Sequence, residues 1–176
     1  MITFFSIILG IIFVDQITKW IAVIFLKGNP SEVIIEGILR FTYIENRGAA
    51  FGMLSNHRWV FLVISTIAIA FLIVYMIKWR PDSKWACVAI AFMAGGGIGN
   101  MIDRTILGYV IDFIDFYAFP TVWMYVFNVA ASFVCVGAVM LMYYLIVETV
   151  KETKAAKAAK ALKAEAEENN GDSDVE

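Results

Sequence analysis

The sequence is poor in charge, in histidine and in cysteine. Only 17% of its 176 residues are charged and 61% are hydrophobic, whereas a soluble domain is about half apolar and about a quarter charged. A net charge of −2 without a dense basic patch argues against a nucleic-acid surface. The one histidine, His57, has no evident ligand partners, so no metal site is expected. Cys87 and Cys135 lie inside apolar runs, which indicates buried structural thiols and not a disulfide framework.

Long apolar runs predict a membrane protein. About 20 apolar residues cover the hydrocarbon core of a bilayer. Three uncharged runs are long enough: Trp59–Ile77, Trp85–Ile102 and Thr121–Val147. A fourth run, Thr3–Leu26, is equally apolar but contains Asp15, Gln16 and Lys19. A signal peptide would carry a positive charge before its apolar stretch, but here no Lys or Arg precedes Lys19. The expected fold is therefore an all-α membrane protein with four transmembrane helices.

Lysine and arginine in short loops predict the orientation. The loop after the second run holds three within seven residues: Lys78, Arg80 and Lys84. Five lysines follow the fourth run: Lys151, Lys154, Lys157, Lys160 and Lys163. Both segments are expected in the cytoplasm together with both termini, and segment 28–58 is expected outside. The chain then divides into a four-helix membrane domain, 1–150, and a charged cytoplasmic tail, 151–176.

Two short stretches are expected to depart from the simple helical pattern. Val33–Ile38 and Leu39–Ile44 read as strands on either side of Gly37, because β-branched and aromatic residues fill them. They predict a small extracytoplasmic β element. In the tail, the alanine–lysine stretch should be helical, and the acidic end from Glu165 should be disordered.

Ionisable residues within a span are costly and mark candidate functional sites. Asp15 and Lys19 stand four residues apart, so on a helix they share a face and can pair, either to fix packing or to hold a loop. At the end of the third run, Asn100, Asp103 and Arg104 stand at i, i+3 and i+4 and converge on one face. Arg104 could clamp a carboxylate or a carbonyl group.

Three further polar residues lie in apolar surroundings. Asp112 is flanked by apolar residues, which should raise its pKa and suit general acid–base work, although a membrane-facing loop would read similarly. Asp115 is expected to face solvent. Asn128 is a lone amide that needs a partner, either between helices or in a site. Asn46 precedes small residues that allow close approach to something bound.

Five motifs, in this order, resemble lipoprotein signal peptidase, the bacterial type II signal peptidase. They are Asp15–Lys19, Asn46–Phe51, Gly99–Asn100 with Asp103–Arg104, Val110–Phe113 and Phe127–Ala130. The resemblance implies an aspartic endopeptidase of the bacterial cytoplasmic membrane. It implies removal of the signal peptide from prolipoproteins whose lipobox cysteine carries a diacylglyceryl group. It implies a site near the outer face and no metal or organic cofactor. Membrane lipid is a further partner, nucleic acid is not one, and a monomer is expected.

The resemblance also assigns roles to residues of this chain. Asp112 matches one of the family's two catalytic aspartates, but the position of the second is Ala131, followed by Ser132. The chain is therefore expected to be inactive, as an engineered variant or as a natural paralogue. Substrate-binding roles are implied for Asn46, Gly96, Asn100, Arg104 and Asn128. Asp103 would orient Arg104, and Asp15 and Lys19 would have a mainly structural role.

Two other classes of function were weighed against the peptidase. A lipopeptide-binding protein without catalytic activity could use the same scaffold, and the codon for residue 131 in the parent gene would separate it from an engineered protease. A small transporter would place charges near the middle of several spans. Instead, the second, third and fourth runs are uncharged and the polar residues gather towards one side.

Overall fold

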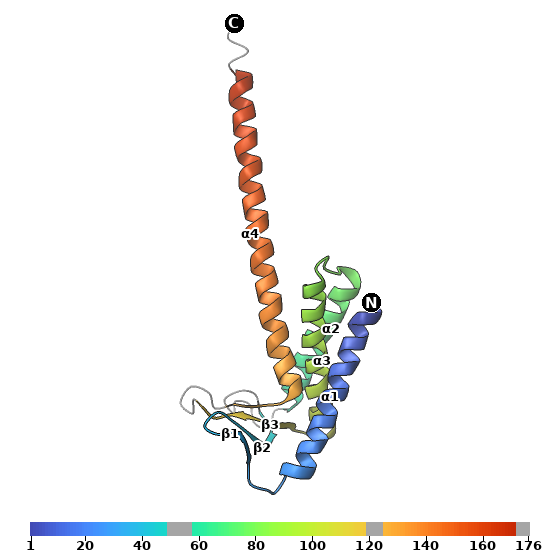
Figure 1. The fold of residues 1–176 in the computed structure, drawn as a ribbon. Helices are drawn as coiled ribbons and strands as arrows, with labels where there is room; N and C mark the ends of the chain where they lie inside the picture. Colours follow the sequence, from blue (N-terminus) through green and yellow to red (C-terminus); the bar gives the residue numbers. More distant parts are fainter. Residues whose placement is uncertain (49–57, 119–124, 172–176) are drawn as a thin grey trace.

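The computed structural model describes residues 1–48, 58–118 and 125–171. The elements in chain order are α1 (Ile2–Leu26), β1 (Glu32–Ile35), β2 (Leu39–Asn46), α2 (Arg58–Lys78), α3 (Lys84–Ile106), β3 (Val110–Phe116), β4 (Val126–Phe127) and α4 (Val129–Gly171). Figure 1 shows the helices side by side, with the strands gathered at one end of the bundle and the N-terminus at the other.

The described part of the chain contains four helices that are long and apolar enough to cross a membrane. Their candidate spans are Ile2–Leu26, Trp59–Lys78, Lys84–Ile106 and Val129–Lys157, so the four predicted spans are confirmed. Large apolar side chains cover their outer surfaces, as a lipid environment requires. Cys135 also lies exposed on α4, so the expectation that both thiols are buried is wrong for this one.

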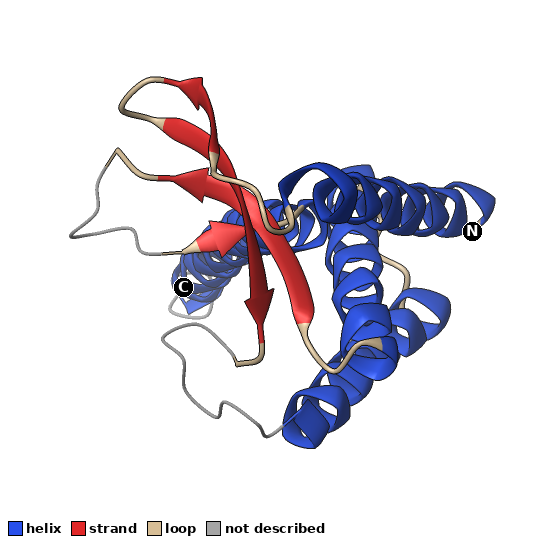
Figure 2. Ribbon diagram, turned by 90° about the horizontal axis from the view of Figure 1, so that it is seen from below, coloured by secondary structure: helices blue, strands red, loops and turns tan. Residues whose placement is uncertain are grey.

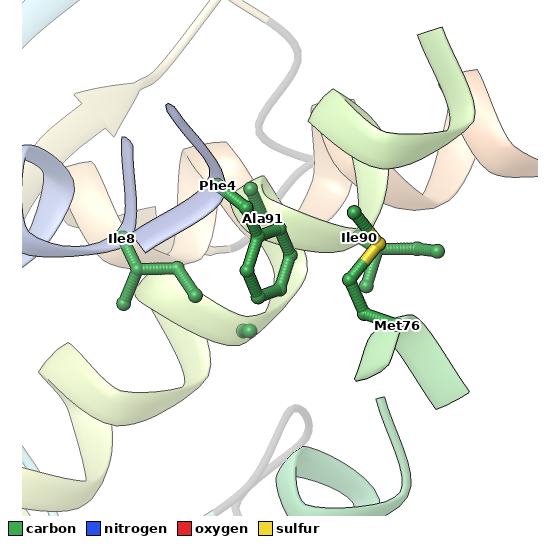
Figure 3. Close-up of a cluster of buried hydrophobic side chains, with 6 residues drawn as sticks. Phe4, Ile8, Met76, Ile90 and Ala91 are labelled. Carbon is green, nitrogen blue, oxygen red and sulfur yellow. The ribbon is translucent and has the colours of Figure 1, made fainter. Parts of the chain in front are cut away.

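Helix α3 is the centre of the bundle, because it packs against α1, α2 and α4. Its small residues permit this. A methyl group added at Gly96 would overlap the carbonyl oxygen of Ala130 on α4, and one added at Gly99 would lie 2.7 Å from Oδ2 of Asp15 on α1. At the end away from the strands, apolar side chains of α1, α2 and α3 form a buried cluster (Figure 3). It includes Phe4, Ile8, Met76, Ile90 and Ala91.

The four strands form one antiparallel sheet in the order β1-β2-β3-β4, seen next to the helices in Figure 2. The two predicted strands are confirmed as β1 and β2, although β1 ends at Ile35 and not at Ile38, and β3 and β4 add to them. Ile111 and Phe113 of β3 pack with Ala22 and Leu26 at the end of α1. This contact fixes the sheet to the bundle and places Asp112, between the two packed residues, close to the helix ends.

Helix α4 differs from the predicted fourth span at both ends. The span was expected from Thr121, whereas α4 begins at Val129, and residues 121–124 lie outside the described residues. Asn128 ends strand pairing and caps the helix, because its Oδ1 accepts the N–H of Ala131 at 2.7 Å. At the other end α4 runs to Gly171, where disorder was expected from Glu165. Alanine, lysine and glutamate are strong helix formers, which favours this extension.

We predict that Gly96→Ala destabilises the bundle by about 1–3 kcal/mol, because the new methyl group would force α3 and α4 apart. Gly10→Ala is the matched control: nothing lies within 4 Å of its added Cβ, and alanine favours a helix over glycine by up to about 1 kcal/mol. Thermal unfolding in detergent should show a lower midpoint for Gly96→Ala only. A similar loss in both variants would contradict close packing as the cause.

Candidate active site

A buried ion cluster lies between α1 and α3. Lys19 is 2% exposed, and its Nζ lies 2.8 Å from Oδ2 of Asp15 and 2.9 Å from Oδ2 of Asp103. It also donates to Oδ1 of Asn100 at 3.0 Å. The pairing predicted from the four-residue spacing of Asp15 and Lys19 is therefore present. The second carboxylate, that of Asp103, was not foreseen as a partner of this lysine.

Each carboxylate of this cluster has a further partner on another element. Oδ1 of Asp15 accepts the backbone N–H of Ala130 at 2.8 Å, in the first turn of α4. Oδ2 of Asp103 accepts the N–H of Ile111 on β3 at 3.1 Å. Gln16 donates to both carboxylates, at 3.1 and 3.0 Å. The sequence indicates Gln16 only as a polar residue next to Asp15 in an apolar span. Its contacts with both carboxylates are not predicted by the sequence.

Asp112 lies on β3 and is 5% exposed. Two side-chain amides bracket its carboxylate: Asn46 donates to Oδ2 at 2.8 Å, and Asn128 donates to Oδ1 at 2.6 Å. Each amide oxygen accepts a backbone N–H, from Gly48 at 3.1 Å and from Ala131 at 2.7 Å, which turns the NH₂ groups towards Asp112. Asn46, Asn128 and Asp112 are thus brought together from β2, the start of α4 and β3.

Burial raises the pKa of the Asp112 carboxyl from 3.8 to about 6. Hydrogen bonds from Asn46 and Asn128 lower the pKa, as do the positive charges of Lys19 and Arg104, but burial outweighs them. A carboxyl group with this pKa exists in both protonation states near neutral pH. It is therefore suited to general acid–base chemistry.

Position 131 lies beside the same amide as Asp112. Asn128 binds the N–H of Ala131 through its oxygen and the carboxylate of Asp112 through its nitrogen. The methyl group of Ala131 can neither accept nor release a proton. The neighbouring hydroxyl group of Ser132 donates to the carbonyl oxygen of Asn128 at 2.9 Å, so it is engaged with the helix backbone.

Other candidate residues have surroundings that differ from those expected. The Arg104 guanidinium donates to the carbonyl oxygen of Asn100 at 3.4 Å and lies 5.4 Å from the ring centre of Phe61. Among the described residues, Asp103 makes no hydrogen bond to Arg104, because its carboxylate binds Lys19, Gln16 and Ile111 instead. Gly96 lies in the α3–α4 packing, where an added Cβ would overlap the carbonyl oxygen of Ala130.

The expectation that Asp115 faces solvent is wrong. The register of the sheet places Asp115 opposite Arg40, and the two side chains form an ion pair of 2.6 Å. Asp115 is 9% exposed. It therefore joins β2 to β3 and takes no part in the Asp112 site. No cluster of three metal-ligating side chains occurs in the parts of the chain that the structure describes.

Comparisons with known proteins match most of the chain. A family model described as signal peptidase (SPase) II matches residues 7–147. A lipoprotein signal peptidase of Caldanaerobacter subterraneus is 47% identical over 136 residues, which cover 77% of this chain and 90% of the relative. That of Halothermothrix orenii is 39% identical over 141 residues, covering 80% and 93%.

Solved structures with a similar fold also match most of the chain. A structure described as a bacterial membrane enzyme, determined by the in meso method at 2.3 Å resolution, is similar with a TM-score of 0.77 and 33% identity. The match covers 84% of this chain and 89% of the solved one. A second such structure, at 1.9 Å resolution, has a TM-score of 0.73 with 33% identity, and the match covers 81% and 92%.

The raised pKa of Asp112 predicts how stability depends on pH. A raised pKa means that the folded chain binds this proton more tightly than the unfolded chain, so stability falls as pH rises through 6 and increases as pH is lowered. Lowering the pH from 7.5 to 5 should stabilise this chain by roughly 1.4 kcal/mol more than the Asp112→Asn variant. Thermal unfolding in detergent at both pH values measures this difference as a few degrees. Equal pH responses in the two chains would refute it.

Proposed function

The chain belongs to the signal peptidase II family, whose aspartic hydrolases remove the signal peptides of prolipoproteins, and from this premise we propose a function for its site. The scaffold is that of an intramembrane endopeptidase for prolipoproteins whose lipobox cysteine carries a diacylglyceryl group. Asp112 is its remaining catalytic carboxyl. The observation that carries this proposal is the burial of Asp112 between the amides of Asn46 and Asn128.

The chemistry needs two carboxyl groups. Two close carboxyls cannot both ionise easily, so they share a proton. The ionised one accepts a proton from the attacking water, and the protonated one donates a proton to the substrate. Asp112 can fill either role, but Ala131 fills neither, and the hydroxyl of Ser132 is held by the helix backbone. We therefore propose that the chain as written does not cleave prolipoproteins.

A second candidate function follows from Ala131 itself. A chain that keeps the scaffold and lacks one carboxyl could serve as a lipopeptide-binding paralogue. It would bind the lipidated signal peptide and release it uncleaved. Asn100 and Arg104, at the end of α3 nearest the sheet, are proposed to hold the substrate backbone together with Asn46 and Asn128.

Recognition of the substrate is proposed to be largely lipid-driven. A diacylglyceryl group is mostly methylene groups, each worth about 0.8 kcal/mol when buried. A shallow, open groove on the surface of α1, at the level of the span, is lined by Gln16 and five apolar residues: Leu9, Ile12, Phe13, Ile17 and Trp20. Gln16 also donates to the Asp15 and Asp103 carboxylates, so this groove adjoins the buried polar cluster.

The proposed location is the bacterial cytoplasmic membrane, with both termini in the cytoplasm and the site near the outer face. Two observations support it. The basic residues between α2 and α3 and in the C-terminal half of α4 favour the cytoplasmic side. The sheet, whose strand β3 contains Asp112, lies at the opposite end of the bundle from the N-terminus (Figure 1).

The central prediction concerns Ala131. Cleavage of a diacylglyceryl-modified prolipoprotein by this chain should be negligible, and Ala131→Asp alone should raise it by about 10⁴-fold or more, because the catalytic pair is restored. Asp112→Asn in that background should abolish it again. Release of signal peptide in nanodiscs measures all three.

The control substrate is the same precursor without its diacylglyceryl group, which the restored enzyme should cleave poorly. Robust cleavage by the unmodified chain would show that the second carboxyl lies elsewhere. A folded Ala131→Asp chain that binds lipidated precursor and still does not cleave it would favour the binding paralogue.

The proposed orientation is tested by cysteine labelling in intact cells. With Cys87 and Cys135 replaced by serine, an impermeant thiol reagent should label Glu36→Cys, in the turn between β1 and β2. It should not label Asp82→Cys, between α2 and α3. Both native side chains are exposed, so access to the reagent decides the result. The reverse labelling pattern would invert the proposed topology.

A further inference from the structure

We propose that Lys19 is a positioning residue that holds both catalytic positions, 112 and 131, through the carboxylates of Asp15 and Asp103. The inference rests on the proposed function, because position 131 has a chemical role only there. It goes beyond the structural role expected for Lys19, since it names the two backbone groups that the lysine places and predicts that they move together when it is removed.

The ammonium group of Lys19 lies between two carboxylates. Its Nζ lies 2.8 Å from Asp15 and 2.9 Å from Asp103. The three residues are 2%, 0% and 2% exposed. One cation between two buried carboxylates brings α1 and α3 to a fixed separation. Gly99 permits this approach, because any side chain there would meet the Asp15 carboxylate.

Each of these carboxylates accepts a backbone N–H next to a catalytic position. Asp15 accepts the N–H of Ala130, the residue directly before position 131. Asp103 accepts the N–H of Ile111, the residue directly before Asp112. Each catalytic position therefore directly follows a residue whose backbone N–H is bound by one of the two carboxylates that pair with Lys19. A shift of the ammonium group would alter the placement of α4 and β3 relative to each other.

The backbone N–H of Ala130 has no alternative acceptor within α4. It lies in the first turn of α4, where backbone N–H groups have no acceptor one turn earlier. Asn128 caps the N–H of Ala131 with its side chain, and its backbone oxygen accepts the N–H of Ser132. The N–H of Ala130 depends on Asp15. Its exchange with solvent thus reports the Asp15 contact specifically.

A chain of hydrogen bonds through Asn100 and Asn128 also links Lys19 to Asp112. Lys19 donates to Oδ1 of Asn100, which also accepts from Nδ2 of Asn128 at 3.0 Å. The same nitrogen of Asn128 donates to Asp112. Gln16 also bridges the two carboxylates but carries no charge. Loss of Lys19 would remove the cation that lies between the two buried carboxylates, and Gln16 would not prevent them from separating.

The test is amide hydrogen exchange by NMR on the chain as it stands, with ¹⁵N labels at alanine, isoleucine and serine. Lys19→Met should speed exchange at Ala130 and at Ile111 by at least about tenfold. Asp15→Ala should speed Ala130 alone, and Asp103→Ala should speed Ile111 alone. Lys27→Met is the matched control, since Lys27 pairs with Glu45 at the surface, and it should change neither amide.

The amide of Ser132 separates positioning from general loosening of the helix. It donates to the carbonyl oxygen of Asn128, the residue directly before α4, so its exchange should stay unchanged. Equal acceleration at Ser132 and Ala130, or no change at Ala130 and Ile111 in folded Lys19→Met, would overturn the inference. If Lys19→Met does not fold, Lys19→Gln replaces it, because glutamine keeps a donor and lacks the charge. If neither folds, Asp15→Ala and Asp103→Ala decide: selective release of one amide each supports the inference, and release of neither overturns it.

A kinetic arm connects the inference to catalysis. In the Ala131→Asp background, Lys19→Met should lower kcat by about 100-fold, the cost of misplacing a catalytic group by about 1 Å, with KM little changed. Lys27→Met should leave both constants unchanged. A raised KM with an unchanged kcat would contradict positioning. If Ala131→Asp itself shows no cleavage, the proposed function fails, and the exchange results still decide the inference.

Discussion

One buried ammonium group between two carboxylates is the interaction on which the rest of this structure depends. Within a bilayer no water is available to solvate a charge, so each ionic group needs a partner supplied by the protein. The ionic partners of Lys19 are Asp15 on the same helix and Asp103 on α3. The oxygen atoms of the two carboxylates then bind the first turn of α4 and the start of β3. Helices and sheet are thereby joined at one place.

Sequence reasoning succeeded where the signal was local. Apolar runs predicted the four spans, β-branched residues around Gly37 predicted two short strands, and a four-residue spacing predicted the Asp15–Lys19 pair. It failed where distant partners decide. Strand β3 exists because it pairs with β2, and Asp115 is buried because that register places Arg40 opposite it. Nothing near these residues in the chain indicates either partner.

The candidate site divides in the same way. Asp112 and Ala131 could be identified by resemblance, because short motifs surround both. The partners of Asp103 could not, since helical spacing places Asp103 near Arg104 and says nothing about a lysine on another helix. In the structure, Asp112 is held in place although position 131 carries no carboxyl group. Asn46 and Asn128 hold Asp112, and backbone N–H groups hold both amides.

The contact between Gly99 and Asp15 restricts how this chain can evolve. A Cβ at position 99 would lie 2.7 Å from the Asp15 carboxylate, so no larger residue is tolerated at 99 while the aspartate stays. Removing the aspartate first would leave Lys19 with one carboxylate fewer and the N–H of Ala130 without its acceptor. Each single substitution is therefore harmful on its own, and the effects of changing both positions would not add. Positions 15 and 99 are therefore expected to change together in evolution, although 83 residues lie between them in the chain.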